Sequence, residues 1–240
     1  MSEDWKKEFL KEFRKKTLLD RLNLSVNELS ELGIGWLIIS FIILYLSGVI
    51  NILINEGRIP NSLILYLFII GISFFTHELT HKFTAIRFGA KAYFRLSKEG
   101  LFITLLSLLI GIPILAVGAV FWWGEASAST GIRGRVSSAG PISNIVLAGL
   151  FLVIQGLGGL LGGSELLLFL LEPTSSIGLL FYFIGSRGVY LNVFLGIFNL
   201  LPIGVLDGAK VLAWDGRIWL ALIGSLLALG IFGGSFFLFF

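Results

Sequence analysis

The two histidines of the chain lie four residues apart, in an H-E-x-x-H run from His77 to His81. Residues i and i+4 share one face of a helix, about 5–6 Å apart, so both imidazoles can bind the same metal ion. Glu78 lies beside them, where it can act as a general base on a metal-bound water. The chain has no cysteine, so nitrogen and oxygen atoms must supply the ligands. These residues therefore predict a hydrolytic metal site.

Zn²⁺ suits this chemistry, because it binds neutral imidazoles and a carboxylate and keeps one position open for water. Bound zinc lowers the pKa of that water to about 7 and polarises a carbonyl, so we expect hydrolysis of a peptide bond. Three aspartates, Asp4, Asp20 and Asp215, lie in polar or interfacial segments. Asp207 follows a long apolar run and precedes Gly208. Its position fits a third ligand and, equally, a helix cap or turn.

The segment around the H-E-x-x-H run is apolar, and this makes its polar side chains informative. Two histidines and a glutamate inside a transmembrane helix cost several kcal/mol unless they are paired or bound to a metal. A metal site therefore explains the run better than a purely structural polar cluster does.

The composition predicts a membrane protein. Of the 240 residues, 56% are hydrophobic and 14% are charged, which leaves too few polar residues to cover a soluble domain. An uncharged run over residues 34–54 is long enough to cross about 30 Å of hydrocarbon. The net charge of +3 fits lipid headgroups better than nucleic acid, so we expect no nucleic-acid partner. We therefore expect an all-α membrane protein, a polytopic bundle of five to six transmembrane helices.

Two parts of the chain differ in polarity. Residues 1–32 are charged, with Trp5, Phe9 and Phe13 spaced by four, which is typical of an amphipathic helix on the cytoplasmic headgroups. A solvated helix against other cytosolic parts of the protein is the alternative. Residues 33–240 form the transmembrane domain, with a short strand expected around 93–96. Its apolar stretches cover residues 34–54, 62–88, 101–123, 142–161, 177–201 and 218–240.

Three motifs in this order resemble the site-2 protease family of intramembrane zinc metalloproteases. They are H-E-x-x-H at His77 to His81, G-P-x-x-N at Gly140 to Asn144, and N-x-x-P with L-D-G from Asn199 to Gly208. The resemblance covers about the central 60% of the chain. Thr80 stands where many members have glycine, and no stretch resembles the PDZ or CBS domains that some members carry.

The resemblance implies roles for individual residues. His77, His81 and Asp207 would bind zinc, and Glu78 would act as the base. Asn144 would contact the substrate or the oxyanion, with a helix-capping role as the alternative.

The three ligands must lie at one depth in the membrane, and this constrains the topology. If 101–123 crossed the bilayer, Asp207 would lie far from the histidines. If that segment instead folds back at Gly111 and Pro113, Asp207 reaches their depth. The re-entrant arrangement also puts sixteen of the eighteen Lys and Arg residues on the cytoplasmic side, as the positive-inside rule favours. We therefore expect five full spans, a re-entrant segment and a cytoplasmic amino terminus in a multi-pass protein of the cell membrane.

The function predicted from these features is proteolysis of transmembrane protein substrates within the lipid bilayer. One alternative is a zinc hydrolase that acts on a lipid or a small molecule through the same ligands. Another is a non-enzymatic membrane protein, either a metal transporter or a scaffold. The sequence does not specify the oligomeric state.

Overall fold

Four long apolar helices form the body of the protein. The computed structural model describes residues 24–57, 59–108, 114–124, 129–204 and 206–234. Within them, the helices long and apolar enough to cross a membrane are α3 (Val26–Leu46), α5 (Asn61–Arg87), α7 (Thr130–Leu160) and α9 (Ile177–Asn199). The predicted helical membrane bundle is confirmed.

Among the described residues, four helices are long and apolar enough to cross a membrane, compared with the five to six transmembrane helices that we expected. The next apolar helix, α11 (Gly216–Phe232), has 17 residues and covers about 26 Å at 1.5 Å per residue. It is therefore shorter than the roughly 30 Å of hydrocarbon in a bilayer. The expected amphipathic pattern at Trp5, Phe9 and Phe13 lies outside the described residues.

The first long helix begins and ends earlier than we expected. Ser25 caps it, because its Oγ accepts a hydrogen bond from the backbone N–H of Glu28. The expected single span over 34–54 is wrong, since Gly48 has a φ of 76° and separates α3 from the short helix α4 (Val49–Glu56). A left-handed glycine of this kind interrupts a helix, and the chain turns there.

A two-stranded antiparallel sheet follows α5. Strand β1 (Lys91–Leu96) is followed by α6 (Lys98–Ser107), and the chain then returns as β2 (Gly118–Trp123). Leu96 lies opposite Gly118 in the register. The strand expected around 93–96 is confirmed, whereas β2 was not expected.

The pairing of the strands decides between the two topologies. The backbone N–H of Ser97 donates to the carbonyl of Val117 over 3.0 Å, so the intervening segment begins and ends at the same place. The segment therefore returns rather than crosses, as the re-entrant prediction requires. Gly111 and Pro113, where we expected the fold, lie outside the described residues.

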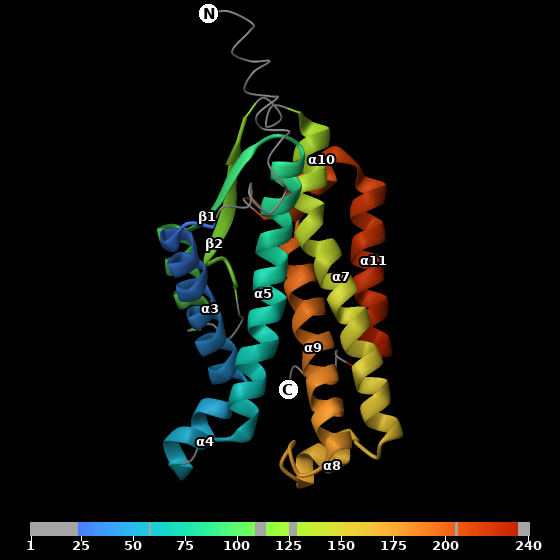
Figure 1. Cartoon of the computed structure of the whole chain (residues 1–240). Helices are drawn as coiled ribbons and strands as arrows, with labels where there is room; N and C mark the ends of the chain where they lie inside the picture. Colours follow the sequence, from blue (N-terminus) through green and yellow to red (C-terminus); the bar gives the residue numbers. More distant parts are fainter. Residues whose placement is uncertain (1–23, 58, 109–113, 125–128, 205, 235–240) are drawn as a thin grey trace, which may run out of the picture.

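Successive long helices run in opposite directions. Figure 1 shows α4 and the short helix α8 (Glu165–Leu170) at one end of the bundle, and the short helix α10 (Asp207–Trp214) at the other. α7 and α9 lie side by side with close backbones: a Cβ on Gly185 would lie 2.2 Å from the backbone nitrogen of Gln155. Small residues permit such close contact between membrane helices. This arrangement brings the start of α10 next to the last turns of α5.

Candidate metal centre

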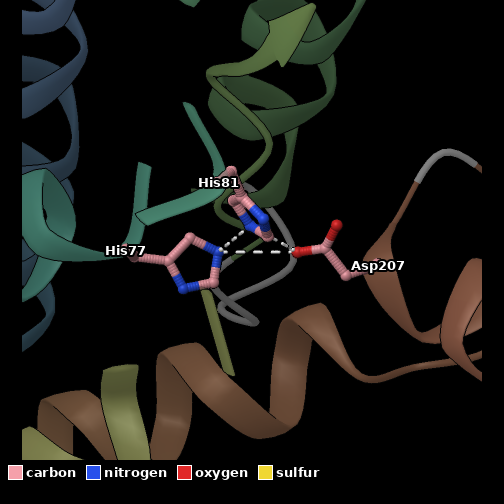
Figure 2. A group of neighbouring side chains, drawn as sticks. All are labelled: His77, His81 and Asp207. Carbon is pink, nitrogen blue, oxygen red and sulfur yellow. Dashed lines mark hydrogen bonds and ion pairs between the residues drawn. The ribbon is translucent and has the colours of Figure 1, made fainter. Parts of the chain in front are cut away.

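His77 and His81 lie one turn apart on α5 and point into the protein. Both side chains are buried, and their Nε2 atoms are 3.2 Å apart. Figure 2 shows the two imidazoles facing the same point, as the i and i+4 spacing predicts.

Asp207 approaches this point from the first residue of α10. Its Oδ2 lies 2.9 Å from His81 Nε2 and 3.6 Å from His77 Nε2 (Figure 2). The ligand atoms of the three residues all lie within 4.8 Å of one another. The N-cap of α10 is Leu206, and no side chain caps this helix, so the structure does not support the capping alternative for Asp207. The structure thus brings together the three residues that the sequence predicted as ligands.

The spacing and chemistry of these atoms fit zinc. Tetrahedral zinc with bonds of about 2.0–2.1 Å holds its ligand atoms about 3.3 Å apart. The three distances here are 2.9, 3.2 and 3.6 Å. Two imidazole nitrogens and one carboxylate oxygen are also the donor types that zinc takes in catalytic sites.

The other nitrogen of each imidazole has its own hydrogen-bond partner. His81 Nδ1 lies 2.7 Å from the backbone carbonyl of Val136, and His77 Nδ1 lies 2.6 Å from Asn144 Oδ1. A carbonyl oxygen only accepts, so the Nδ1 of His81 carries the proton and its Nε2 lone pair is free for a metal. Partners of this kind fix the orientation of metal-binding histidines.

Gly140 on α7 leaves the room that the two imidazoles need. A Cβ added there would lie 2.3 Å from His81 Nε2 and 2.6 Å from His77 Nε2. The first residue of the G-P-x-x-N motif therefore has a steric role at the metal site.

Glu78 lies in the cavity that opens onto the metal site. Its side chain is buried, and its Oε2 has no hydrogen-bond partner in the part of the chain that the structure describes. An unpaired buried carboxylate oxygen is costly, and a water at the metal would satisfy it. The position of Glu78 fits the role of general base.

The cavity has a volume of about 420 Å³ and is bordered by several elements. His77, Glu78, His81 and Asp207 line it, and its walls also include β2, parts of α6, Asn199 and Lys210. Lys210 lies one helical turn after Asp207, with its Nζ 3.8 Å from Asp207 Oδ1. Sequence reasoning missed Lys210, although the i and i+3 spacing from Asp207 could have indicated it.

Asn144 is fully buried and lies in the interior of α7, so it caps no helix. Its Oδ1 contacts His77 and its Nδ2 donates to Asn192 Oδ1 over 2.9 Å. Its predicted contact with the substrate stays a prediction. Sequence reasoning also missed Asn192, although an amide in the middle of an apolar helix is a signal of a buried polar contact.

Two proteins of known sequence resemble this chain over long stretches. One is "Putative zinc metalloprotease MJ0611" of Methanocaldococcus jannaschii, which is 34% identical over 212 residues, covering 85% of this chain and 94% of that protein. The other is "Putative zinc metalloprotease YwhC" of Bacillus subtilis, which is 36% identical over 168 residues, covering 64% of this chain and 70% of that protein. No protein-family model and no solved structure matches the chain. Since the first relative is similar over nearly its whole length, the chain belongs to this family of zinc metalloproteases, and zinc is its cofactor.

Proposed function

We propose that the protein is an intramembrane endopeptidase of the site-2 protease type, which cuts peptide bonds in transmembrane protein substrates. The observation that carries this proposal is the position of the site on α5, a helix long and apolar enough to cross a membrane. His77 follows Asn61 by sixteen residues, about 24 Å along that helix. A soluble metalloprotease would have no reason to hold its ligands there.

The protein's own groups divide the chemical work. Zinc, when bound, would supply the Lewis acid that polarises the scissile carbonyl and acidifies a water. His77, His81 and Asp207 would hold it. Glu78 would take a proton from the attacking water and pass that proton to the leaving amine. The unpaired Oε2 of Glu78 supports this role.

A transmembrane substrate must expose its backbone before hydrolysis, because a helix keeps its carbonyls in internal hydrogen bonds. Strand addition to a sheet edge would expose it, and β2 borders the cavity. We propose that the substrate pairs with the outer edge of β2.

The contacts of β1 support this choice of edge. On the side of β1 away from β2, the backbone N–H of Phe94 donates to Glu28 Oε1 over 2.9 Å. The N–H of Leu96 donates to Glu31 Oε2 over 2.8 Å. These two carboxylates close the outer edge of β1 to another strand.

The register then shows which groups of β2 are available. In an antiparallel pair, the backbone N–H and C=O groups of two opposed residues either bond to each other or both face away from the partner strand. The backbone N–H of Phe94 faces away from β2, and Phe94 lies opposite Val120. The backbone N–H of Val120 therefore faces the free edge of β2. In the described residues, the outer edge of β2 is thus the one that a substrate strand can join.

The test uses purified protein in liposomes with a synthetic transmembrane peptide. We expect cleavage by the wild type and a loss of at least a hundredfold in Glu78→Gln, with zinc content unchanged. Glu165→Gln, on the distant helix α8, is the matched control and should keep full activity. Hydrolysis of a lipid or a small molecule, without any cleavage of the peptide, would contradict the proposal.

A further inference from the structure

A buried series of side-chain hydrogen bonds connects the metal site with α9. His77 Nδ1 contacts Asn144 Oδ1 over 2.6 Å, and Asn144 Nδ2 donates to Asn192 Oδ1 over 2.9 Å. Both asparagines have no exposed surface. The three residues come from α5, α7 and α9, so the series joins the three helices that surround the site.

The far end of the series fixes the orientation of the Asn192 amide. Asn192 Nδ2 lies 2.9 Å from the backbone carbonyl of Gly188 and 2.9 Å from Ser73 Oγ. The carbonyl only accepts, and Ser73 already donates its hydroxyl proton to the carbonyl of Ile69 over 2.8 Å. Both neighbours therefore require a donor, and the nitrogen of the amide must face them. The oxygen of Asn192 must then face Asn144.

This orientation is transmitted to the imidazole of His77. Because the Asn192 oxygen only accepts, Asn144 must present its nitrogen to it and its own oxygen to His77. His77 must then carry its proton on Nδ1. In the neutral ring the lone pair is consequently on Nε2, which points toward His81 and Asp207.

We propose that Asn192 is a positioning residue of the zinc centre, which acts through Asn144 to set the tautomer and the ring orientation of His77. The tautomer of His81 does not depend on a side chain, because the backbone carbonyl of Val136 sets it. The tautomer of His77 that can bind zinc therefore depends on Asn144 and Asn192, which lie 67 and 115 residues further along the chain. Outer partners of metal-binding histidines change metal affinity by about 10–100-fold when they are lost.

The test measures zinc affinity of the purified protein by competition with a chromophoric chelator. Asn192→Leu replaces the amide with an apolar side chain of similar volume, and we expect its zinc affinity to fall by about tenfold or more. Ser186→Ala is the matched control, since Ser186 is also buried on α9 and, in the described part of the chain, its hydroxyl bonds to a carbonyl of its own helix, that of Phe183. The control should keep the affinity of the wild type.

A double-mutant cycle separates positioning from a general structural effect. If Asn192 acts through Asn144, Asn192→Leu costs nothing further in a protein that already carries Asn144→Leu. The absorption of the Co²⁺-substituted protein should then be the same for both single variants and the double variant. Losses of affinity that add would overturn the proposal, as would an unchanged affinity in Asn192→Leu.

A milder variant keeps the test valid if the leucine variant does not fold. Asn192→Ser has a shorter side chain, whose hydroxyl does not extend to Asn144, and it should lose zinc affinity in the same direction. Unchanged affinity in this folded variant would equally overturn the proposal.

Discussion

Lys82 Nζ lies 2.6 Å from Glu28 Oε2, and both side chains are buried. Lys82 directly follows His81 on α5, whereas Glu28 belongs to the first turn of α3. The other oxygen of Glu28 accepts the backbone N–H of Phe94 in β1. One carboxylate therefore joins the helix that carries the histidines to the sheet that borders the cavity.

Breaking this buried ion pair should destabilise the protein. Glu28→Gln leaves the ammonium of Lys82 buried without its counter-charge, so we expect the free energy of unfolding to fall by about 3–5 kcal/mol. Denaturant unfolding in detergent measures it. Arg95→Met is the control, because Arg95 pairs with Glu31 at an exposed position, and its loss should cost about 1 kcal/mol or less. Equal losses in the free energy of unfolding would show that the buried ion pair stabilises the protein no more than the exposed one.

Gly140 should tolerate no side chain. In Gly140→Ala the new Cβ would overlap the Nε2 atoms of both histidines, so we expect zinc to be lost from the purified protein. Gly149→Ala is the control on the same helix, since no other element of the described structure lies within 4 Å of a Cβ there. Metal analysis of both variants checks this, and a zinc-loaded Gly140→Ala protein would be incompatible with the observed packing.

The local part of the site could be predicted from the sequence, because one helical turn determines it. His77, Glu78 and His81 belong to a single run whose geometry follows from 3.6 residues per turn. Asp207 is 126 residues beyond His81, and spacing alone left a cap or turn equally open. The resemblance to a family selected it, and the fold then brought it to the histidines.

The contacts between helices could not be predicted in this way. The hydrogen bonds of Asn192 and the ion pair of Lys82 with Glu28 form only where particular faces of separate helices meet. The periodicity of the sequence does not specify which faces those are. Strand β2 was missed because its residues 118–123 are apolar throughout and read as part of a longer membrane segment. The break at Gly48 was missed because a single glycine in an apolar run is often tolerated.

The topology can be tested in this cysteine-free chain with single introduced cysteines. Lys98→Cys and Arg217→Cys, both exposed, lie at the starts of α6 and α11, and we expect an impermeant thiol reagent to label both from the cytoplasmic side. Ser175→Cys, between α8 and α9, should be labelled from the opposite side. Labelling of Lys98→Cys and Ser175→Cys from the same side would contradict the alternating arrangement.

Pairing of the substrate with β2 predicts a specific effect of proline at Val120. Val120→Pro removes the backbone N–H at the free edge but no hydrogen bond to β1, so cleavage of the transmembrane peptide should fall at least tenfold through KM. Zinc content should not change. Val120→Ala keeps the backbone N–H and should retain most of the activity. Similar losses of activity in the two variants would contradict the proposed pairing, because they would show that the side chain of Val120 matters and not its N–H.

The zinc content of the purified protein, with and without Asp207, tests the central claim most directly. We expect about one zinc per chain in the wild type, and a strong loss in Asp207→Ala, because two imidazoles alone do not complete the site. Asp215→Asn, at an exposed capping position of α11, should retain its zinc. Zinc binding that is unchanged in Asp207→Ala would contradict the three-ligand centre on which this account of the protein depends.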